Sequence, residues 1–181
     1  MWSQSKSLRH AACAVLAMAA ASGCSGETRE VETTETLTVR ADRVGVVRIG
    51  MSIDEARRTL GEDLEVDHSD FGSCDHIRPA ALLGALAMVV RDTIVRVEVV
   101  DPGLTTPEGA GIGTTEAQLL ELYGDRARVT PHKYSGPQWH YVTVRAEDDP
   151  AHAIVFETDG QRVQTYRAGR LPEVEWVEGC A

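Results

Sequence analysis

The segment IGMSIDEA, residues 49–56, recurs as IGTTEAQL, residues 112–119. Each copy contains a capping box, in which Ser or Thr is followed three residues later by Glu or Gln: Ser52 with Glu55, and Thr115 with Gln118. In a capping box the hydroxyl accepts a hydrogen bond from the first helical turn, and the later side chain reaches back to the cap backbone. The repeat therefore predicts two helices that begin at these boxes. Gly61 and Gly124 are the expected left-handed residues that end them.

Apolar residues in both predicted helices recur at steps of three and four, which gives each helix one buried face: Ile53, Ala56 and Leu60, then Leu119, Leu122 and Tyr123. Downstream, alternating apolar segments predict antiparallel strands at 87–91, 95–99, 140–145, 153–157 and 162–166, with turns around 92–93 and 159–160, whereas 79–86 fits a strand or a short helix. Val alternates with Arg96 and Glu98, which predicts a sheet with one covered face. In the sequence comparison of the two halves, Val97 falls in step with Val163.

The sequence therefore predicts an α+β fold of two tandem repeats, each a helix followed by antiparallel strands, with the helices packed on one face of a sheet. Repeat 1 is expected at residues 36–104 and repeat 2 at residues 105–181. Residues 24–35 are rich in Thr, Glu and Gly, and we expect them to form a flexible tether.

The first 23 residues have the pattern of a signal peptide. Lys6 and Arg9 precede an apolar run at 11–21, which is shorter than the roughly 20 residues that span a bilayer. The run closes on Ala21-Ser22-Gly23-Cys24, which resembles the bacterial lipobox. This resemblance implies cleavage before Cys24 and lipidation of its sulfur. The alternative is a plain secretory signal that is cut within 19–23 and leaves Cys24 as a free thiol.

Charge constrains the partners of the mature chain. Removal of residues 1–23 takes away Lys6, Arg9 and no acidic residue, so the formal charge changes from −10 to −12. Such acidity disfavours nucleic acid and anionic lipid as partners. We therefore expect membrane attachment through N-terminal acyl chains, palmitate among them, since stable anchoring takes more than one chain. Ser25 stands where Asp would mark inner-membrane retention, so the resemblance implies an outer-membrane protein that faces the periplasm.

The cysteines follow from the same export signal. Cys13 leaves with the leader and Cys24 is taken by lipid, so Cys74 and Cys180 remain. In an exported chain this pair favours a disulfide, and the chain-entropy model assigns a loop of roughly 100 residues about 4–5 kcal/mol. The alternative is a pair of structural or metal-binding thiols, but no Cys-x-x-Cys or Cys/His spacing supports a zinc site.

The first copy, from Ile49 to Gly61, resembles the Gly-Met-Thr-x-x-Glu-Val…Leu-Gly element of the SmpA/OmlA outer-membrane lipoproteins, the small lipoprotein subunit of the β-barrel assembly machinery. Duplication of such a unit resembles the β-lactamase inhibitor protein, which has two helix-and-sheet repeats in tandem. The resemblance covers the leader, the helix motif and the hairpin pattern. It implies the fold above, and it implies a role in envelope assembly or in inhibition.

No catalytic, metal or cofactor site is predicted. The glycines of 109–113 precede a helix but lack the context of a phosphate loop, the histidines are scattered, and no Gly-x-Ser-x-Gly occurs. Polar-tipped aromatic residues gather at one place in an aromatic-poor chain, which predicts a partner-binding segment: Tyr134, Trp139, His140 and Tyr141. The alternative is that Trp139 and Tyr141 cover one sheet face while His140 faces the other.

The resulting hypothesis is a non-enzymatic lipoprotein that binds another envelope protein through its sheet or its loops. The first alternative is an inhibitor-like protein that acts on an extracytoplasmic enzyme. The second alternative is an unrecognised enzyme or metal binder that uses residues 134–141 with His132 and His152.

Overall fold

The computed structural model of this chain describes residues 37–68 and 73–180. The chain divides into two units, Met1–Thr33 and Thr34–Ala181, and the described residues all belong to the second. The predicted leader, Cys24 and the tether lie outside the described residues. The second unit is an α+β fold with two antiparallel sheets and few helices, which confirms the predicted fold class.

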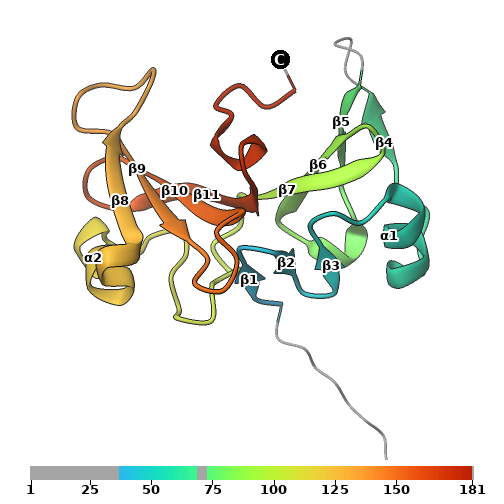
Figure 1. Cartoon of the computed structure of the whole chain (residues 1–181), viewed down its shortest axis with the longest axis horizontal. Helices are drawn as coiled ribbons and strands as arrows, with labels where there is room; N and C mark the ends of the chain where they lie inside the picture. Colours follow the sequence, from blue (N-terminus) through green and yellow to red (C-terminus); the bar gives the residue numbers. More distant parts are fainter. Residues whose placement is uncertain (1–36, 69–72, 181) are drawn as a thin grey trace, which may run out of the picture. The chain divides into compact units, whose positions relative to one another are not determined.

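The large sheet has eight strands, which fall into two runs of four: β4 (Val66–His68), β5 (Cys74–Ile77), β6 (Ala85–Val90) and β7 (Thr93–Val99), then β8 (Ala127–Pro131), β9 (His140–Arg145), β10 (His152–Thr158) and β11 (Val163–Arg170). Their spatial order is β4-β5-β6-β7-β11-β10-β9-β8 (Figure 1). Each run is an antiparallel meander, and the two runs join where β7 pairs with β11. The outermost strands of the sheet are therefore β4 and β8.

The other elements are short. The small sheet comprises β1 (Val39–Arg40), β2 (Arg43–Val44) and β3 (Val47–Arg48), and the helices are α1 (Ile53–Leu60), α2 (Glu116–Tyr123) and the 3-10 turns η1 (Ala80–Leu82), η2 (Gly124–Arg126) and η3 (Glu173–Glu175). One α-helix thus precedes each four-strand run of the large sheet. Among the described residues, no helix has the length and apolar character needed to cross a bilayer.

Both capping boxes are present. The Ser52 hydroxyl accepts from the Glu55 N–H at 3.2 Å, and the Thr115 hydroxyl accepts from the Gln118 N–H at 3.2 Å. The reciprocal bonds from the two cap backbone N–H groups measure 2.9 Å each. These reciprocal bonds satisfy donors that a helix start otherwise leaves without partners.

The two helices end differently. Gly61 ends α1 in the left-handed conformation, with φ 68° and ψ 25°. Gly124 ends α2 with φ 51° and ψ −129°, and the chain continues into η2, so the predicted left-handed stop is wrong there. The predicted buried face of α2 is also wrong at Leu122, which is 42% exposed. Successive helical residues are turned by about 100°, so burial of Leu119 and Tyr123 directs Leu122 away from the core.

Equivalent backbone hydrogen bonds connect each repeated segment to the last strand of its run. They are Gly50 N–H to Ile94 O and Ile94 N–H to Met51 O, both 2.8 Å, then Gly113 N–H to Val163 O and Val163 N–H to Thr114 O, both 2.9 Å. These bonds match Ile94 with Val163. The sequence comparison that matched Val97 with Val163 is therefore three residues out of step. The two hairpins have equal lengths, since Val89 pairs with Ile94 and Thr158 pairs with Val163.

The predicted strands lie within β6, β7, β9, β10 and β11, with ends that differ by a few residues. Residues 79–86 contain both η1 and the start of β6. The first turn lies at Arg91 and Asp92, which have positive φ, one residue earlier than expected. Strands β1 to β5 and β8 were not predicted, because runs of two to five residues carry too little periodicity.

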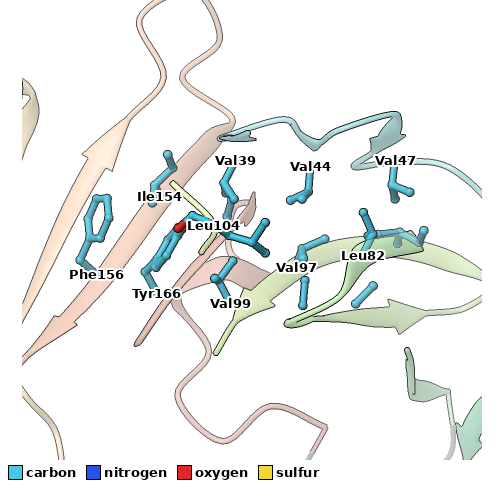
Figure 2. Close-up of a cluster of buried hydrophobic side chains, with 14 of the residues drawn as sticks. Val39, Val44, Val47, Leu82, Val97, Val99, Leu104, Ile154, Phe156 and Tyr166 are labelled. Carbon is cyan, nitrogen blue, oxygen red and sulfur yellow. The ribbon is translucent and has the colours of Figure 1, made fainter. Parts of the chain in front are cut away.

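One face of the large sheet packs against the small sheet and both α-helices. Figure 2 shows Val39, Val44 and Val47 of the small sheet lying over Val97 and Val99, and all five side chains are fully buried. Buried side chains of α1 and α2, including Ala56 and Leu119, belong to the same cluster. This apolar contact is the main core of the unit.

The opposite face, called the open face below, is crossed by the C-terminal segment, residues 171–180 (Figure 1). Val174 is fully buried there and packs with Tyr141, Ala153 and Val155. The prediction of a single covered face is therefore wrong in the middle of the sheet, where Arg96 is 2% exposed. The sequence pattern missed this cover because it comes from a segment about 80 residues further along the chain.

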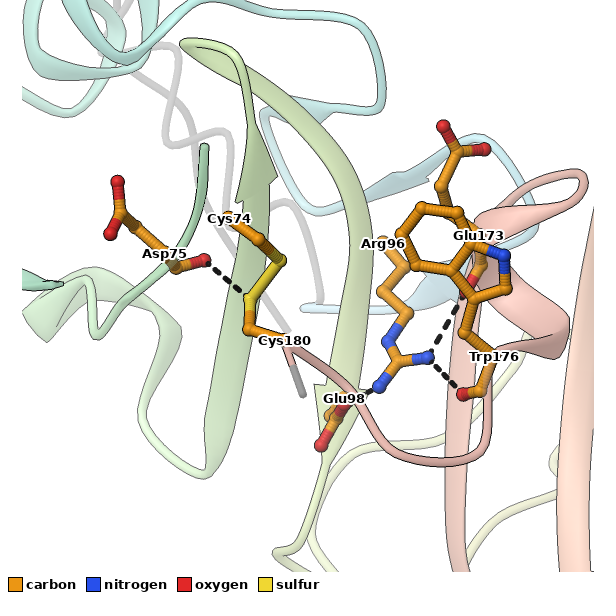
Figure 3. The surroundings of a disulfide bond; sticks show 7 residues. All are labelled: Cys74, Asp75, Arg96, Glu98, Glu173, Trp176 and Cys180. Carbon is orange, nitrogen blue, oxygen red and sulfur yellow. Dashed lines mark hydrogen bonds and ion pairs between the residues drawn. A yellow bond between two sulfur atoms is a disulfide. The ribbon is translucent and has the colours of Figure 1, made fainter. Parts of the chain in front are cut away.

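The segment ends at the predicted disulfide. Cys74 at the start of β5 and Cys180 have sulfur atoms 2.09 Å apart and Cα atoms 5.3 Å apart (Figure 3). The bond closes a loop of 106 residues, and it connects the C-terminal segment to the first four-strand run. The disulfide that the export argument predicts is thus present.

At the junction of the two runs, the backbones of β7 and β11 approach each other closely at Gly169, which lies opposite Arg96. An added Cβ at Gly169 would lie 2.5 Å from the Arg96 Cβ and 2.5 Å from the Val95 carbonyl oxygen. Gly169→Ala should therefore lower the free energy of unfolding by about 2–3 kcal/mol, since backbone must move to relieve the overlap. Urea denaturation of the two proteins measures this difference.

Gly136→Ala is the matched control, because its added Cβ would approach the Gln138 side-chain amide, which can rotate away. We expect this control to change the free energy of unfolding by less than about 0.5 kcal/mol. Equal urea midpoints for the two variants would contradict the proposed close approach.

Candidate functional site

Two buried arginines of the open face hold the C-terminal segment. Arg96 donates from Nη1 to the carbonyl oxygens of Glu173, at 3.1 Å, and Trp176, at 2.5 Å, and its Nη2 pairs with Glu98 (Figure 3). Burial lowers the pKa of Arg96 and the Glu98 carboxylate opposes that shift. The guanidinium stays charged at neutral pH, since arginine titrates far above it. Its donors therefore need acceptors, and the segment supplies two of them.

Arg167 repeats this arrangement one strand away. Its Nε donates to the Val174 carbonyl oxygen at 2.6 Å, and its Nη1 pairs with Glu157. Glu157 also lies 3.4 Å from Nε2 of His132. The His132 Nδ1 accepts from two backbone N–H groups, which leaves the proton on Nε2, directed at Glu157. Charged groups on this part of the open face are therefore neutralised pairwise.

The predicted partner-binding residues divide between the two faces. Trp139 and Tyr141 both contact the His132 ring, edge-on at 6.0 Å and stacked at 4.4 Å between ring centroids. His140 faces the helices, where its Nδ1 lies 3.0 Å from a Glu116 carboxylate oxygen. Tyr134 is 61% exposed in the loop between β8 and β9. This is the packing arrangement that the strand alternation allowed, and partner binding by these four residues stays a prediction.

A hollow of about 700 Å³ lies on the open face of the second run, beside η3. Its lining includes one residue from each of β8, β9, β10 and β11, and each of these residues is the direct partner of the next across the strand pairs: Arg128, Thr143, Val155 and Arg167. Paired residues of neighbouring antiparallel strands point to the same face. Tyr141 and Arg145 stand two residues before and after Thr143 on β9, so they point to that face as well. Thr143 and Val155 thus form a floor that the larger side chains surround.

The charge at this hollow differs from that of the chain. The full chain carries −10, yet the hollow is lined by four arginines and three acidic residues: Arg126, Arg128, Arg145, Arg167, Asp125, Glu147 and Glu175. Arg126 and Arg145 approach Glu147 and Glu175 only to 3.9 Å. Arg128 is exposed and makes no hydrogen bond or ion pair within residues 37–68 and 73–180. Since Arg167 is paired with Glu157, three arginines face three acidic residues here, and the hollow lacks the negative excess of the whole chain.

The Tyr141 hydroxyl is buried and has no hydrogen-bond partner among the described residues. Burial raises the pKa of Tyr141, and the nearby Lys133 backbone N–H opposes this shift without making a bond of normal geometry. The hydroxyl therefore keeps its proton at neutral pH. It is a donor that still lacks an acceptor, which is costly for a buried polar group.

The side chains at the hollow can supply positive charge and hydrogen-bond donors to a bound group. Within the described part of the chain, no cluster of three or more His, Cys, Asp and Glu residues has the geometry to hold a metal ion. Sequence reasoning missed Arg128, Arg145 and Arg167. The available signal was the alternation on β9, where Tyr141, Thr143 and Arg145 make one polar stripe.

Comparison with known proteins leaves the function open. No protein-family model matches the chain, and no curated protein matches it significantly. The chain is similar to the uncharacterized protein yfeY from Escherichia coli, with 14% identity and a TM-score of 0.46 over 74% of this chain and 99% of that one. It is also similar to an extracellular protein containing a SCP domain from Bacillus anthracis, with 10% identity and a TM-score of 0.43 over 68% of this chain and 44% of that one. Likenesses at this level do not identify a function.

Arg96→Met should loosen the C-terminal segment, because it leaves the Glu173 and Trp176 carbonyls and the Glu98 carboxylate without their donor. Loss of one partner of a buried pair costs about 3–5 kcal/mol, and Glu98 is 27% exposed, so about 2–4 kcal/mol is expected here. Urea denaturation measures the loss, and limited proteolysis should cleave within residues 171–180.

The matched control is Arg78→Met, since Arg78 is exposed and makes no hydrogen bond or ion pair within the described ranges. Its unfolding free energy should stay within about 0.5 kcal/mol of the parent chain. Similar protease resistance in the Arg96 and Arg78 variants would show that Arg96 does not hold the segment.

Proposed function

We propose that this chain is a non-enzymatic lipoprotein, anchored in the outer membrane and facing the periplasm, that binds another envelope protein through its open face. The hollow beside η3 carries this proposal. Three arginines, a threonine and a buried tyrosine hydroxyl gather there, and their hydrogen-bonding capacity is only partly used: Arg128, Arg145, Arg167, Thr143 and Tyr141. Arg and Tyr are the residue types that most often dominate protein interfaces.

The proposed anchor is Cys24, which follows the small residues Ala21, Ser22 and Gly23. The acidic mature chain would be repelled by anionic headgroups, so acyl chains on Cys24 supply the attachment. Ser25 favours transfer to the outer membrane, in line with the resemblance to that sorting rule. The tether at 24–35 then gives the folded unit room to meet a partner.

The two four-strand runs are, in this proposal, tandem copies of one unit. Two observations support the duplication: each run follows one capped helix, and equivalent hydrogen bonds connect each repeated segment to β7 or β11. The resemblance to SmpA/OmlA lipoproteins and to the β-lactamase inhibitor protein fits such a unit, with both helices on the same face of the large sheet. Both resemblances suggest a protein as the binding partner, in assembly or in inhibition.

Cys24→Ser should release the protein from membranes, because it removes the sulfur that carries the acyl chains. Fractionation of cells that express each form measures the share of protein in the soluble periplasmic extract. Wild-type protein should remain in the outer-membrane fraction. Retention of the Cys24→Ser form in that fraction would contradict lipid anchoring.

Photo-crosslinking in living cells tests the binding role. A benzophenone amino acid replaces Tyr134 or Glu147, because both positions are highly exposed and they lie in the loops that precede and follow β9. Leu83, which is 79% exposed in the first run, is the control position. We expect one crosslinked protein from the first two positions and none from the control.

The same band from all three positions, or no band from any, would contradict binding through the open face. Mass spectrometry of the crosslinked band separates the two roles. An extracytoplasmic enzyme as the partner supports the inhibitor-like alternative, whereas a structural envelope protein supports the assembly role.

A further inference from the structure

We infer that the hollow of the open face binds a carboxylate group, presented by an acidic side chain of the partner protein. This inference rests on the proposed function and specifies the chemistry of its contact. It depends on the positions of Arg128 and Arg145 around Thr143, on the Tyr141 hydroxyl that lacks a partner among the described residues, and on a gathering of arginines in a strongly negative chain. Each of these observations points to a bound anion.

The two arginines of β8 and β9 differ from those that hold the C-terminal segment. Arg167 already bonds to Glu157 and to the Val174 carbonyl. Arg128 lacks any such partner within the described ranges. Arg145 is 52% exposed, donates to the Pro150 carbonyl oxygen at 3.2 Å in an exposed hydrogen bond, and has one long contact with Glu175. Both guanidinium groups can therefore reorient toward a ligand without breaking a buried interaction.

Arg128 and Arg145 are both neighbours of Thr143 on the open face. Arg128 is its direct partner across the β8–β9 pair, and Arg145 is two residues further along the same face of β9. Direct antiparallel partners have Cβ atoms about 5 Å apart, and residues two apart on one strand are separated by about 7 Å. A small group seated above Thr143 is thus within reach of both arginines and of the Tyr141 side chain on the other side.

The Tyr141 hydroxyl provides a second, independent indication of a ligand. The residue is 9% exposed and lines the hollow, and its buried hydroxyl has no acceptor among the described residues. A ligand oxygen would satisfy this donor once the side chains that cover it move aside, and the hydroxyl otherwise carries the cost of an unpaired buried group. A ligand that is only a cation, or only apolar, would leave the hydroxyl unsatisfied.

The surroundings favour a carboxylate over a phosphate group. Guanidinium groups bind carboxylates through two parallel hydrogen bonds. Three acidic residues line the same hollow and the whole chain is strongly negative, so a phosphate, which concentrates up to two negative charges on one group, meets more repulsion than a carboxylate with a single charge. Val155 on the floor gives an apolar surface for the methylene groups of an acidic side chain.

A fluorescein-labelled hexaglutamate peptide is the probe, and fluorescence anisotropy measures its binding to the full protein purified in a non-ionic detergent. We expect saturable binding that glutarate displaces and that weakens as salt is added. Hexaglutamine with the same label is the uncharged control. Equal binding of the two peptides overturns the inference, and so does binding of inorganic phosphate without binding of hexaglutamate or glutarate.

Three variants locate the binding. Arg128→Gln combined with Arg145→Gln should weaken hexaglutamate binding at least tenfold, and Tyr141→Phe should weaken it severalfold. Arg78→Gln removes an exposed arginine from the first run and should leave the affinity unchanged. Thermal unfolding verifies that every variant is folded. Unchanged affinity in the double arginine variant, or the same loss in Arg78→Gln, overturns the inference.

The two proposals fail in different ways. If crosslinks at Tyr134 and Glu147 persist in the double arginine variant and hexaglutamate does not bind the parent chain, the carboxylate inference is wrong and the binding role remains. If hexaglutamate binds as expected and no crosslink forms at either position, the proposed binding of an envelope protein is wrong.

Discussion

A charged guanidinium buried in the middle of a sheet constrains the rest of this structure. Arg96 lies where the two four-strand runs meet, on β7 opposite Gly169 of β11, and it is almost fully removed from solvent. A buried charge is costly unless it is paired and hydrogen-bonded. Glu98 supplies one acceptor and two backbone carbonyls of the C-terminal segment supply two more, while the Arg96 Nε has no acceptor among the described residues. The course of the last ten residues therefore follows from a residue that precedes them by about 80 positions.

This constraint divides the open face into a covered and an uncovered part. Arg96 and Arg167 together fix η3 over β7, β10 and β11, and the disulfide at Cys180 holds the end of the segment against β5. The segment reaches Tyr141 at the start of β9, through Val174, and leaves Thr143 further along that strand partly exposed. Thr143 and the side chains around it are left accessible there, and the hollow forms between the segment and the sheet edge.

The parts of this fold that sequence could predict are those set by local chemistry. Ser52 and Thr115 specify helix starts within four residues, and both helices begin where the boxes indicate. The predictions for Leu122 and Gly124 failed, because tertiary contacts and the 3-10 turn that follows α2 decide how this helix ends. Local periodicity does not decide it. The cover over Arg96 was beyond prediction for a related reason: an Arg in an alternating strand has the pattern of a solvated residue. The Cys74–Cys180 bond could be predicted from export of the chain. The leader and the lipid account for the other two cysteines, so only this pair remains to form a disulfide.

The arginines of the open face thus lie in two distinct environments. This difference in environment identifies the candidate site better than the number of arginines does. Arg96 and Arg167 have carboxylate and carbonyl partners that bury them, and their role is to hold a segment. Arg128 and Arg145 belong to the same face but have exposed guanidinium groups with little or no pairing. A chain of formal charge −10 has enough carboxylates to pair with two more arginines. Arg128 instead has no such acceptor within the described ranges, and Arg145 has only an exposed bond to the Pro150 carbonyl and a long contact with Glu175. Beside a tyrosine hydroxyl that lacks an acceptor among the described residues, this is the arrangement expected of groups that bind an acceptor on another molecule.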